Sequence, residues 1–308
     1  MNANPDWKLA RRTRGVFAFT GLDVLPVLSA CVHLGFVAWT VVGFADRPWW
    51  ANLLCGAVYA WAVAWNVNGI SHNFLHTPYF VSRRLNRAFG LVESLAIGFS
   101  QTYYKALHLR HHVGNADRPD ADGQTRDPLS IYRHGRGGAP EPVLRYAFLG
   151  AVRDDAPDLM ADLRRRRPAD ARWVRIELAA LAAAAGAALL VDWRAVLFLV
   201  PCNYLGQALS QLSGYYEHYR GNPDEPIAWG VSSSSRAYNV IWFGNGLHAE
   251  HHFRPGVHWS RLPVLHRAIA DRQRAAGTHV IGTSHMTGFL ARENRAGFLA
   301  RANRSADA

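Results

Sequence analysis

Three short clusters of histidine stand out because their spacing suits metal binding. They are HNFLH at 72–76, HLRHH at 108–112 and HAEHH at 248–252. The first pairs its histidines at positions i and i+4, and the other two place them at i, i+3 and i+4. On a helix these spacings bring the side chains to one face. Neutral imidazole binds zinc, copper, iron and nickel, so each cluster is a candidate ligand set.

Together the clusters predict two metal ions rather than one. They supply eight imidazoles, from His72, His76, His108, His111, His112, His248, His251 and His252. His218, in the stretch GYYEHY, can supply a ninth. A tetrahedral zinc takes only about four ligands, whereas this number suits two ions with about four or five each. The isolated His33 is interpreted as an ordinary packed residue.

The residues around these histidines argue against two other kinds of metal site. Zinc proteases with an H-E-x-x-H motif carry Glu directly after the first histidine, but here those positions hold Asn73, Leu109 and Ala249. The E-x-x-H pairs of soluble di-iron carboxylate bundles are also missing from the sequence. So are a G-x-G-x-x-G fingerprint and a C-x-x-C pair.

Four apolar runs, nearly free of charged residues, predict the membrane spans that carry the clusters. The predicted spans are about 24–45, 48–71, 174–191 and 195–216. A helix of ~20 residues crosses a hydrocarbon core, and the third run approaches that length only if its polar start lies at the interface. Very short connections make each pair a helical hairpin. The alternative is a soluble bundle of four buried helices, which we disfavour because soluble helices carry a charged face.

The charge distribution predicts the orientation of these spans. The net charge is +11, with 32 Arg against 2 Lys. Only Arg47 and Arg194 fall in the tight turns, and the other 32 basic residues lie on the opposite side. Because basic residues concentrate on the cytoplasmic side, we expect both termini and the histidine clusters there. The expected location is the bacterial inner membrane, with membrane lipid and no nucleic acid as a partner.

These observations predict an all-α integral membrane protein with a single domain over residues 1–308. Two transmembrane hairpins would carry a cytosolic helical cap formed by 72–173 and 217–287. A basic tail at 288–308 contains the duplication GFLARENRA and GFLARANRS, which predicts an amphipathic segment on the surface. The basic start and first apolar run are not a secretory signal, since the run is too long and a second span follows at once.

Three further segments have simple interpretations. Residues 85–104 are moderately apolar, but a crossing there would separate the first two clusters, so we expect this segment in the interface or re-entering. Residues 114–142 are rich in Gly, Pro and Asp and predict a loop. The four arginines at 164–167 are interpreted as a flank for anionic lipid, with docking of an acidic redox protein as the alternative. The cysteines all lie in predicted spans as packing residues, at Cys31, Cys55 and Cys202.

The order of the clusters, H-x-x-x-H, H-x-x-H-H and H-x-x-H-H, resembles the membrane fatty acid desaturase and hydroxylase superfamily. The resemblance runs from about His72 to Pro263, and both hairpins lie in the places expected for the family. The stretch HAEHHFRPGVHWSRLP is similar to the closing motif that carotenoid ketolases and acyl-lipid desaturases share. Asn115, Asp117 and the Asp127–Pro128 pair after the second cluster also resemble the family.

The resemblance implies a non-haem di-iron centre. Its ligands would be His72, His76, His108, His111, His112, His218, His248, His251 and His252. Related enzymes often place Asn four residues before a ligand histidine, but here Gly214 and Gly244 occupy the positions before His218 and His248. Asn245 is one position off and is a candidate to hold a metal-bound water.

The resemblance also implies the reaction class. Two Fe(II) ions with O2 as co-substrate would oxidise a C–H bond of a lipid-like acyl chain, with electrons from a ferredoxin- or cytochrome-like donor. Fatty acyl desaturation is the expected outcome. A hydroxylase, a carotenoid-type ketolase or an oxidative decarboxylase would use the same site. A zinc-binding transporter or structural membrane protein is a remote alternative, because transporters place polar ligands near the midplane of the bilayer.

Overall fold

The computed structural model describes residues 6–113, 118–120, 122–153 and 156–294. The chain divides into two compact units, which are described separately. We call one the apolar unit, comprising Ala10–His111 and Phe148–Ser210, and the other the C-terminal unit, comprising Met1–Leu9, His112–Ala147 and Gln211–Ala308. The single-domain organisation stays a prediction.

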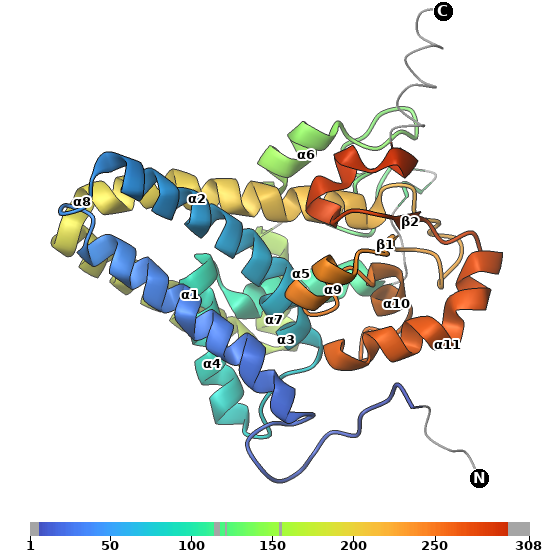
Figure 1. Cartoon of the computed structure of the whole chain (residues 1–308), viewed down its shortest axis with the longest axis horizontal. Coiled ribbons are helices and arrows are strands. Elements are labelled where there is room, and N and C mark those ends of the chain that lie inside the picture. The colour runs from blue at the N-terminus through green and yellow to red at the C-terminus, as the bar shows by residue number, and fades with distance from the viewer. Residues whose placement is uncertain (1–5, 114–117, 121, 154–155, 295–308) are drawn as a thin grey trace, which may run out of the picture. The chain divides into compact units, whose positions relative to one another are not determined.

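Helices build nearly all of the apolar unit (Figure 1). They are α1 (Val24–Val42), α2 (Trp49–Trp65), α3 (His72–His76), α4 (Arg83–Ile97), α5 (Gln101–His112), α7 (Ala156–Arg166) and most of α8 (Pro168–His218). A 3-10 turn at Gly21–Asp23 leads into α1, and a π-helical segment at Asn66–Ser71 joins α2 to α3. The prediction of a largely helical protein is therefore confirmed.

Three helices in the described part of the chain are long and apolar enough to cross a membrane. They are Gly21–Val42, Trp49–His76 and Pro168–His218. In the apolar window of the third, only 11% of the residues are buried within the protein. Leu190 is 91% exposed. Such a surface suits lipid, because an apolar face of this extent is unfavourable in water. The protein has the helices of a membrane protein.

The third candidate contains a break that divides it into two arms. Asp192 has φ −155° and ψ 104°, which are not helical angles. Its carboxylate accepts hydrogen bonds from the backbone and side-chain nitrogens of Arg194. The break coincides with the predicted turn between the third and fourth spans. Each arm is longer than predicted, since α8 starts at Pro168, a residue suited to the first helical turn. Four crossings stay a prediction.

Close helix packing in the apolar unit depends on glycine. A Cβ atom on Gly206 of α8 would lie 2.6 Å from Val63 Cβ and 2.7 Å from the Ala60 carbonyl of α2. A Cβ on Gly56 would lie 2.6 Å from the ring of Phe198. The backbones of α2 and α8 therefore approach closely, as small residues allow in membrane helices.

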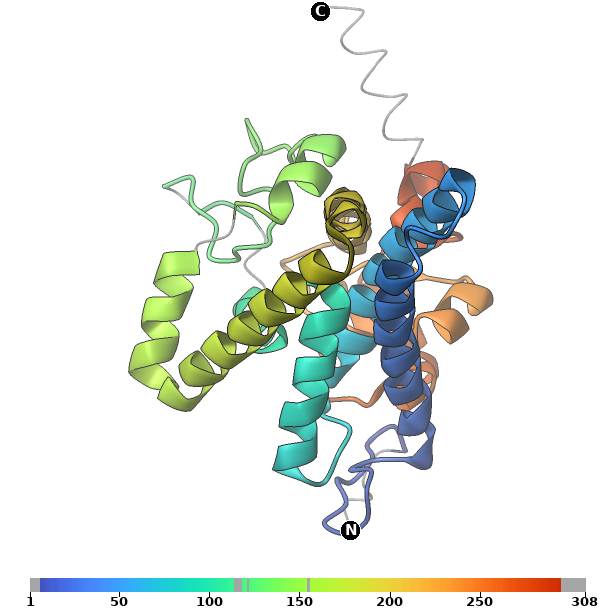
Figure 2. The ribbon, with the colours of Figure 1, turned by 90° about the vertical axis from the view of Figure 1, so that its left-hand side faces the viewer.

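The segment 85–104 does not form one continuous helix. Helix α4 ends at Ile97, and Gly98 follows with φ +83°, a left-handed conformation that glycine adopts readily. Helix α5 then starts at Gln101. Helix α4 lies alongside α1 (Figure 2), and it is not among the three candidate spans. The structure thus excludes a single fifth span over this segment.

The C-terminal unit has short helices around a small core. It contains most of α6 (Val143–Gly150), then α9 (Arg236–Ile241), α10 (His248–Phe253) and α11 (Leu262–Ala275). Strands β1 (Ser232–Ser233) and β2 (Val280–Ile281) pair in parallel, and 3-10 turns lie at Trp259–Arg261 and His285–Leu290. The two strands depart from the expectation of an all-α fold. Apolar side chains of α11 pack with Ile227, Ala228, Leu247 and Val257.

Two predicted segments lie partly outside the described residues. Asn115, Asp117 and most of the duplicated tail lie outside the described residues. The described part of 114–142 consists of turns and irregular structure, as predicted. In the described start of the tail, Gly288, Ala291 and Asn294 are buried, while the residues between them are exposed. Asn294 donates a hydrogen bond to the Gly288 carbonyl. The amphipathic tail stays a prediction.

Candidate metal centre

In the apolar unit, two helices bring histidines of the first two clusters together. Helix α3 carries His72 and His76, and helix α5 carries His108. The donor nitrogens of these three side chains lie within 4.8 Å of one another, and the Nε2 atoms of His72 and His108 are 3.1 Å apart. His111 is 3% exposed, and its ring centroid lies 5.4 Å from that of His108. The helical placement predicted for the first cluster is therefore observed.

The π-helical segment before α3 sets the orientation of the first pair. A π-helix displaces the usual backbone hydrogen bonds, and here side chains satisfy several carbonyls of the segment. The Ile70 carbonyl accepts from the Tyr79 hydroxyl at 3.0 Å, and the Gly69 carbonyl from Asn73 Nδ2 at 2.6 Å. Gln101 Nε2 donates to the Ser71 carbonyl at 3.0 Å, which ties α5 to the residue before His72.

In the C-terminal unit, one group of nitrogens converges from α8 and α10. His218 ends α8, while His248 and His252 lie on α10. The Nε2 atom of His248 is 3.2 Å from that of His218 and 2.8 Å from that of His252. All three side chains are buried. The lone histidine predicted as a ninth ligand thus lies beside the third cluster.

A further pair of histidines in the C-terminal unit also has its ring nitrogens close together. His112 is the last residue of α5, and its Nε2 atom lies 3.1 Å from Nε2 of His251. The indole ring of Trp229 packs against two of these histidines. Its ring centroid lies 4.2 Å from that of His252 and 5.4 Å from that of His218. Trp229 is fully buried, so it restricts the rotamers of the imidazoles around it.

Helix α10 is anchored on the side that its histidines do not use. Glu250 accepts hydrogen bonds from the Ser232 hydroxyl at 2.6 Å and pairs with His266 Nδ1 at 2.5 Å. The hydrogen bond to Glu250 raises the pKa of His266 above its usual value. A Cβ on Gly230 would lie 3.0 Å from the backbone of His248 and Ala249, so this glycine lets the β1 segment approach α10.

The nitrogen distances fit a metal ion. Two ligand atoms that each lie ~2.1 Å from one ion, at an angle of about 90–110°, are separated by roughly 3.0–3.4 Å. The observed Nε2 separations run from 2.8 to 3.2 Å. Lone pairs of neutral imidazoles repel at this distance unless a cation or a proton lies between them. Donor sets made only of imidazole nitrogen suit iron, zinc or copper.

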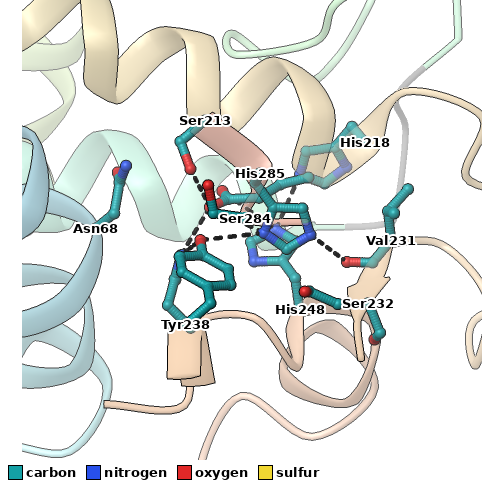
Figure 3. Close-up of polar contacts among 12 residues, drawn as sticks. Asn68, Ser213, His218, Val231, Ser232, Tyr238, His248, Ser284 and His285 are labelled. Atoms are coloured by element: carbon teal, nitrogen blue, oxygen red, sulfur yellow. Dashed lines mark hydrogen bonds and ion pairs between the residues drawn. The ribbon is translucent and has the colours of Figure 1, made fainter. Parts of the chain in front are cut away.

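Next to these histidines lies a buried polar network that the cluster spacing did not reveal, and Figure 3 shows its Ser213, Tyr238 and His285. Glu217, next to His218, accepts hydrogen bonds from Asn245 Nδ2 at 2.8 Å and from the Ser213 hydroxyl at 3.1 Å. Asn245 Nδ2 also donates to the hydroxyl of Tyr238 at 3.2 Å. Asn245 was predicted to hold a water, a role that stays a prediction, and its amide nitrogen serves these two partners.

His285 completes the network. Its Nε2 atom lies 3.0 Å from the Val231 carbonyl and its Nδ1 atom 3.2 Å from the Tyr238 hydroxyl. Burial lowers the pKa of His285 to about 3, so the ring is neutral at physiological pH. The carbonyl can only accept, which places the proton on Nε2 and makes Tyr238 the donor to Nδ1. In the sequence, only the adjacency of Glu217 to His218 could have indicated this network.

Comparisons with known proteins agree with this arrangement. A profile of the fatty acid desaturase family matches residues 47–284, well over half of the 308-residue chain and including all nine histidines. A sphingolipid delta(4)-desaturase of Schizosaccharomyces pombe (strain 972 / ATCC 24843) is 25% identical over 210 residues. That match covers 62% of this chain and 54% of the relative, so the chain spans about half the length of the curated relative. The chain belongs to the fatty acid desaturase family.

Proposed function

We propose that the chain is a membrane-bound, O2-dependent non-haem di-iron oxidoreductase that desaturates a lipid-like acyl chain. Family membership supports lipid desaturation, and the relative is named as a sphingolipid desaturase. The observation that carries the proposal is the convergence of Nε2 atoms at metal-ligand separations within each unit. The proposed substrate is an acyl chain of a lipid.

The proposed metal ligands are the nine histidines. They are His72, His76, His108, His111, His112, His218, His248, His251 and His252. His111 and His112 are consecutive residues, so a single peptide bond joins the histidines of the apolar unit to those of the C-terminal unit. Bound iron with O2 would supply an oxidant able to remove hydrogen from an unactivated C–H bond.

The chain's own residues would hold the iron ligands rigid and keep water out. Trp229 packs against His218 and His252, and the hydrogen bond from Gln101 ties α5 to the start of α3. Ligands fixed in this way need little reorganisation when metal binds. We also propose four crossings, with the histidines on the cytoplasmic side of a bacterial inner membrane, and a separate ferredoxin- or cytochrome-like electron donor.

The test combines metal quantification with product analysis. Purified protein should contain two iron ions per chain and, with a reducing system and O2, should convert a panel of acyl lipids. Loss of two hydrogen atoms from the product mass supports desaturation, whereas gain of one oxygen atom indicates hydroxylation. Binding of a single zinc ion with no lipid oxidation would reject the proposal.

We expect His111→Ala and His251→Ala to abolish turnover and lower bound iron while the protein remains in the membrane, because each removes one ligand. His134→Ala, at an exposed histidine outside the clusters, is the matched control and should keep wild-type iron content. Full activity in either cluster variant would contradict the ligand assignment.

A further inference from the structure

We propose that Glu177 on helix α8 positions the second histidine cluster by holding the start of helix α5. This inference rests on the proposed function and deepens it, because α5 carries three of the proposed metal ligands. Glu177 would act through the helix and not as a ligand, so it is a positioning residue.

Glu177 is a fully buried acidic residue near the start of the candidate span Pro168–His218. A buried carboxylate is costly unless hydrogen bonds compensate it, and ionisable residues in spans are by default candidates for a function. Its partners come from the start of α5. Oε2 accepts from the Ser100 hydroxyl at 2.5 Å and from the Thr102 N–H at 3.0 Å, and Oε1 accepts from the Thr102 hydroxyl at 2.8 Å.

These bonds complete the cap of α5 from a second helix. The first four N–H groups of a helix have no partner within it, and in α5 all four find acceptors. They are Gln101 N–H on the Ser94 hydroxyl (3.0 Å), Thr102 N–H on Glu177 (3.0 Å), Tyr103 N–H on the Ser100 hydroxyl (3.0 Å) and Tyr104 N–H on the Ser100 carbonyl (2.9 Å). Of these acceptors, Glu177 alone lies outside the segment formed by α4 and α5.

The directions of the hydrogen bonds fix the Glu177 side chain. The Ser100 hydroxyl accepts from the Tyr103 N–H, which leaves its proton for Glu177. The Thr102 hydroxyl accepts from Arg87 Nη1 at 3.5 Å and likewise donates to Glu177. Both carboxylate oxygens are therefore acceptors. Because the bonds lead to two different residues of the first turn, they restrain α5 against both rotation and sliding.

Helix α8 also holds the other side of the break between α4 and α5. The side-chain amides of Asn203 and Gln207 donate to the Ile97 carbonyl, at 3.1 Å and 2.9 Å. A break in a helix at membrane depth is tolerated where protein groups satisfy its backbone. Amide donors thus meet the carbonyl end of α4, and the Glu177 carboxylate meets the N–H end of α5, which is the favourable polarity at each terminus.

The geometry of a helix connects this cap to the metal ligands. His108 and His111 are buried on the same helix, two turns or more after the cap. Side chains reach about 5–6 Å from a helix axis, so a rotation of ~10° would move a ring nitrogen by roughly 1 Å. The Nε2 atom of His108 is now 3.1 Å from that of His72. Since ligand distances in a metal site are met within about 0.2 Å, such a rotation would disturb binding.

The experiment measures metal binding, not turnover. Apo protein in detergent is titrated with Co²⁺ against a competing chelator, and the visible bands of bound Co²⁺ report its coordination. We expect Glu177→Ala to weaken Co²⁺ binding by roughly 10-fold, the size of effect that loss of a helix cap produces, and to change the spectrum. Glu177→Gln can still accept from the Thr102 N–H and bond both hydroxyls, so it should stay within about 3-fold of wild type with an unchanged spectrum.

The matched control is Asp192→Ala, which removes another buried carboxylate of α8, one bonded to Arg194 in the turn. It should leave Co²⁺ affinity and spectrum unchanged. Hydrogen–deuterium exchange of the apo proteins adds a local readout. The amides at the start of α5 should exchange faster in Glu177→Ala than in wild type, while those of α2 keep their protection. Thr102→Val, which removes one of the three bonds, should show the same effects more weakly and covers the case in which Glu177→Ala does not fold.

Unchanged Co²⁺ affinity and spectrum in folded Glu177→Ala would overturn the inference and leave the proposed function standing. An equal loss of affinity in Glu177→Gln and Glu177→Ala would also overturn it, because the hydrogen bonds of the cap would then not be what matters. A wild type that binds no pair of ions would instead overturn the proposed function.

Discussion

Single residues in the apolar unit form a second buried polar chain, which lies outside the three histidine clusters. The Ser71 hydroxyl lies 2.5 Å from Glu93 Oε2 and 3.2 Å from Asn66 Oδ1. Asn66 Nδ2 lies 3.1 Å from His33 Nδ1. Ser71 has one proton to donate, so a neutral Glu93 that donates to Ser71 lets every link in the chain have a donor and an acceptor. The lone His33 is thus a packed residue with a partner, as the sequence suggested.

The Glu93 carboxyl makes stability depend on pH. Burial raises its pKa from 4.5 to about 8, so the folded state binds its proton more tightly than the unfolded state. The stabilising contribution is complete below about pH 4.5 and is lost as pH rises toward 8. Glu93→Gln keeps an amide N–H that can donate to Ser71 and cannot ionise. We expect it to gain on the order of 2–4 kcal/mol over wild type between these limits.

Thermal unfolding of apo wild type and Glu93→Gln in detergent, followed from pH 4.5 to 8.5 in steps, measures that difference. Other titrating groups cancel in the comparison. A difference that does not change with pH would show that Glu93 keeps its charge in the fold.

At the scale of single residues, the sequence predicts site residues that recur at a regular helical spacing, and it misses those that have no regular spacing. The cluster histidines were found because their spacing matches a helix face, and the structure places them on α3, α5 and α10. Glu217, Tyr238 and His285 are far apart in sequence and have no common period. Their relation depends on the end of α8 meeting the segment around β1, which no local pattern specifies.

In the apolar unit, small side chains at the contact set how closely helices α2 and α8 can approach. We expect Gly206→Leu to destabilise the protein by about 1–3 kcal/mol or to prevent folding, because its Cβ would overlap Val63 and the Ala60 carbonyl. Gly186→Leu is the matched control, since nothing lies within 4 Å of the Cβ position there. Intrinsic tryptophan fluorescence during heating measures both variants, and equal melting temperatures would contradict the close packing.

The elements themselves were predictable to different degrees. Apolar composition located the candidate spans, and the spacing of His72 and His76 predicted that the second helix continues past residue 71; the helix runs to His76. The π-helical segment has no sequence signature, because it depends on Tyr79, Asn73 and Gln101 satisfying its carbonyls. The segment 85–104 is divided into two helices at Gly98, and the glycine itself is the one sign of this break in the sequence.

At the scale of the whole molecule, the apolar surface and the distribution of basic residues together determine which side of the membrane each segment faces. In the proposed topology the two tight turns face away from the cytoplasm and the histidines face it. We expect Asp46→Cys to react with a membrane-impermeant maleimide added to intact cells, and Asp224→Cys to react only after lysis. Both positions are exposed. The background would carry alanine at Cys31, Cys55 and Cys202, the free cysteines of the chain.

Labelling of both cysteine variants from outside would place the two segments on one side and reject the topology. The sequence predicts this orientation because the basic residues concentrate on one side of the predicted spans. Sequence alone could not show how the two turn arginines are compensated, since that depends on side-chain contacts.

The turn at Asp192 has a consequence for how the protein enters the bilayer. Arg194 donates two side-chain hydrogen bonds to Asp192, and Arg47 in the other turn donates to the Trp39 and Thr40 carbonyls. If these turns are translocated during biosynthesis, each arginine travels already paired. Both helical hairpins can then be inserted as preassembled units, with a smaller electrostatic barrier than an unpaired guanidinium would meet.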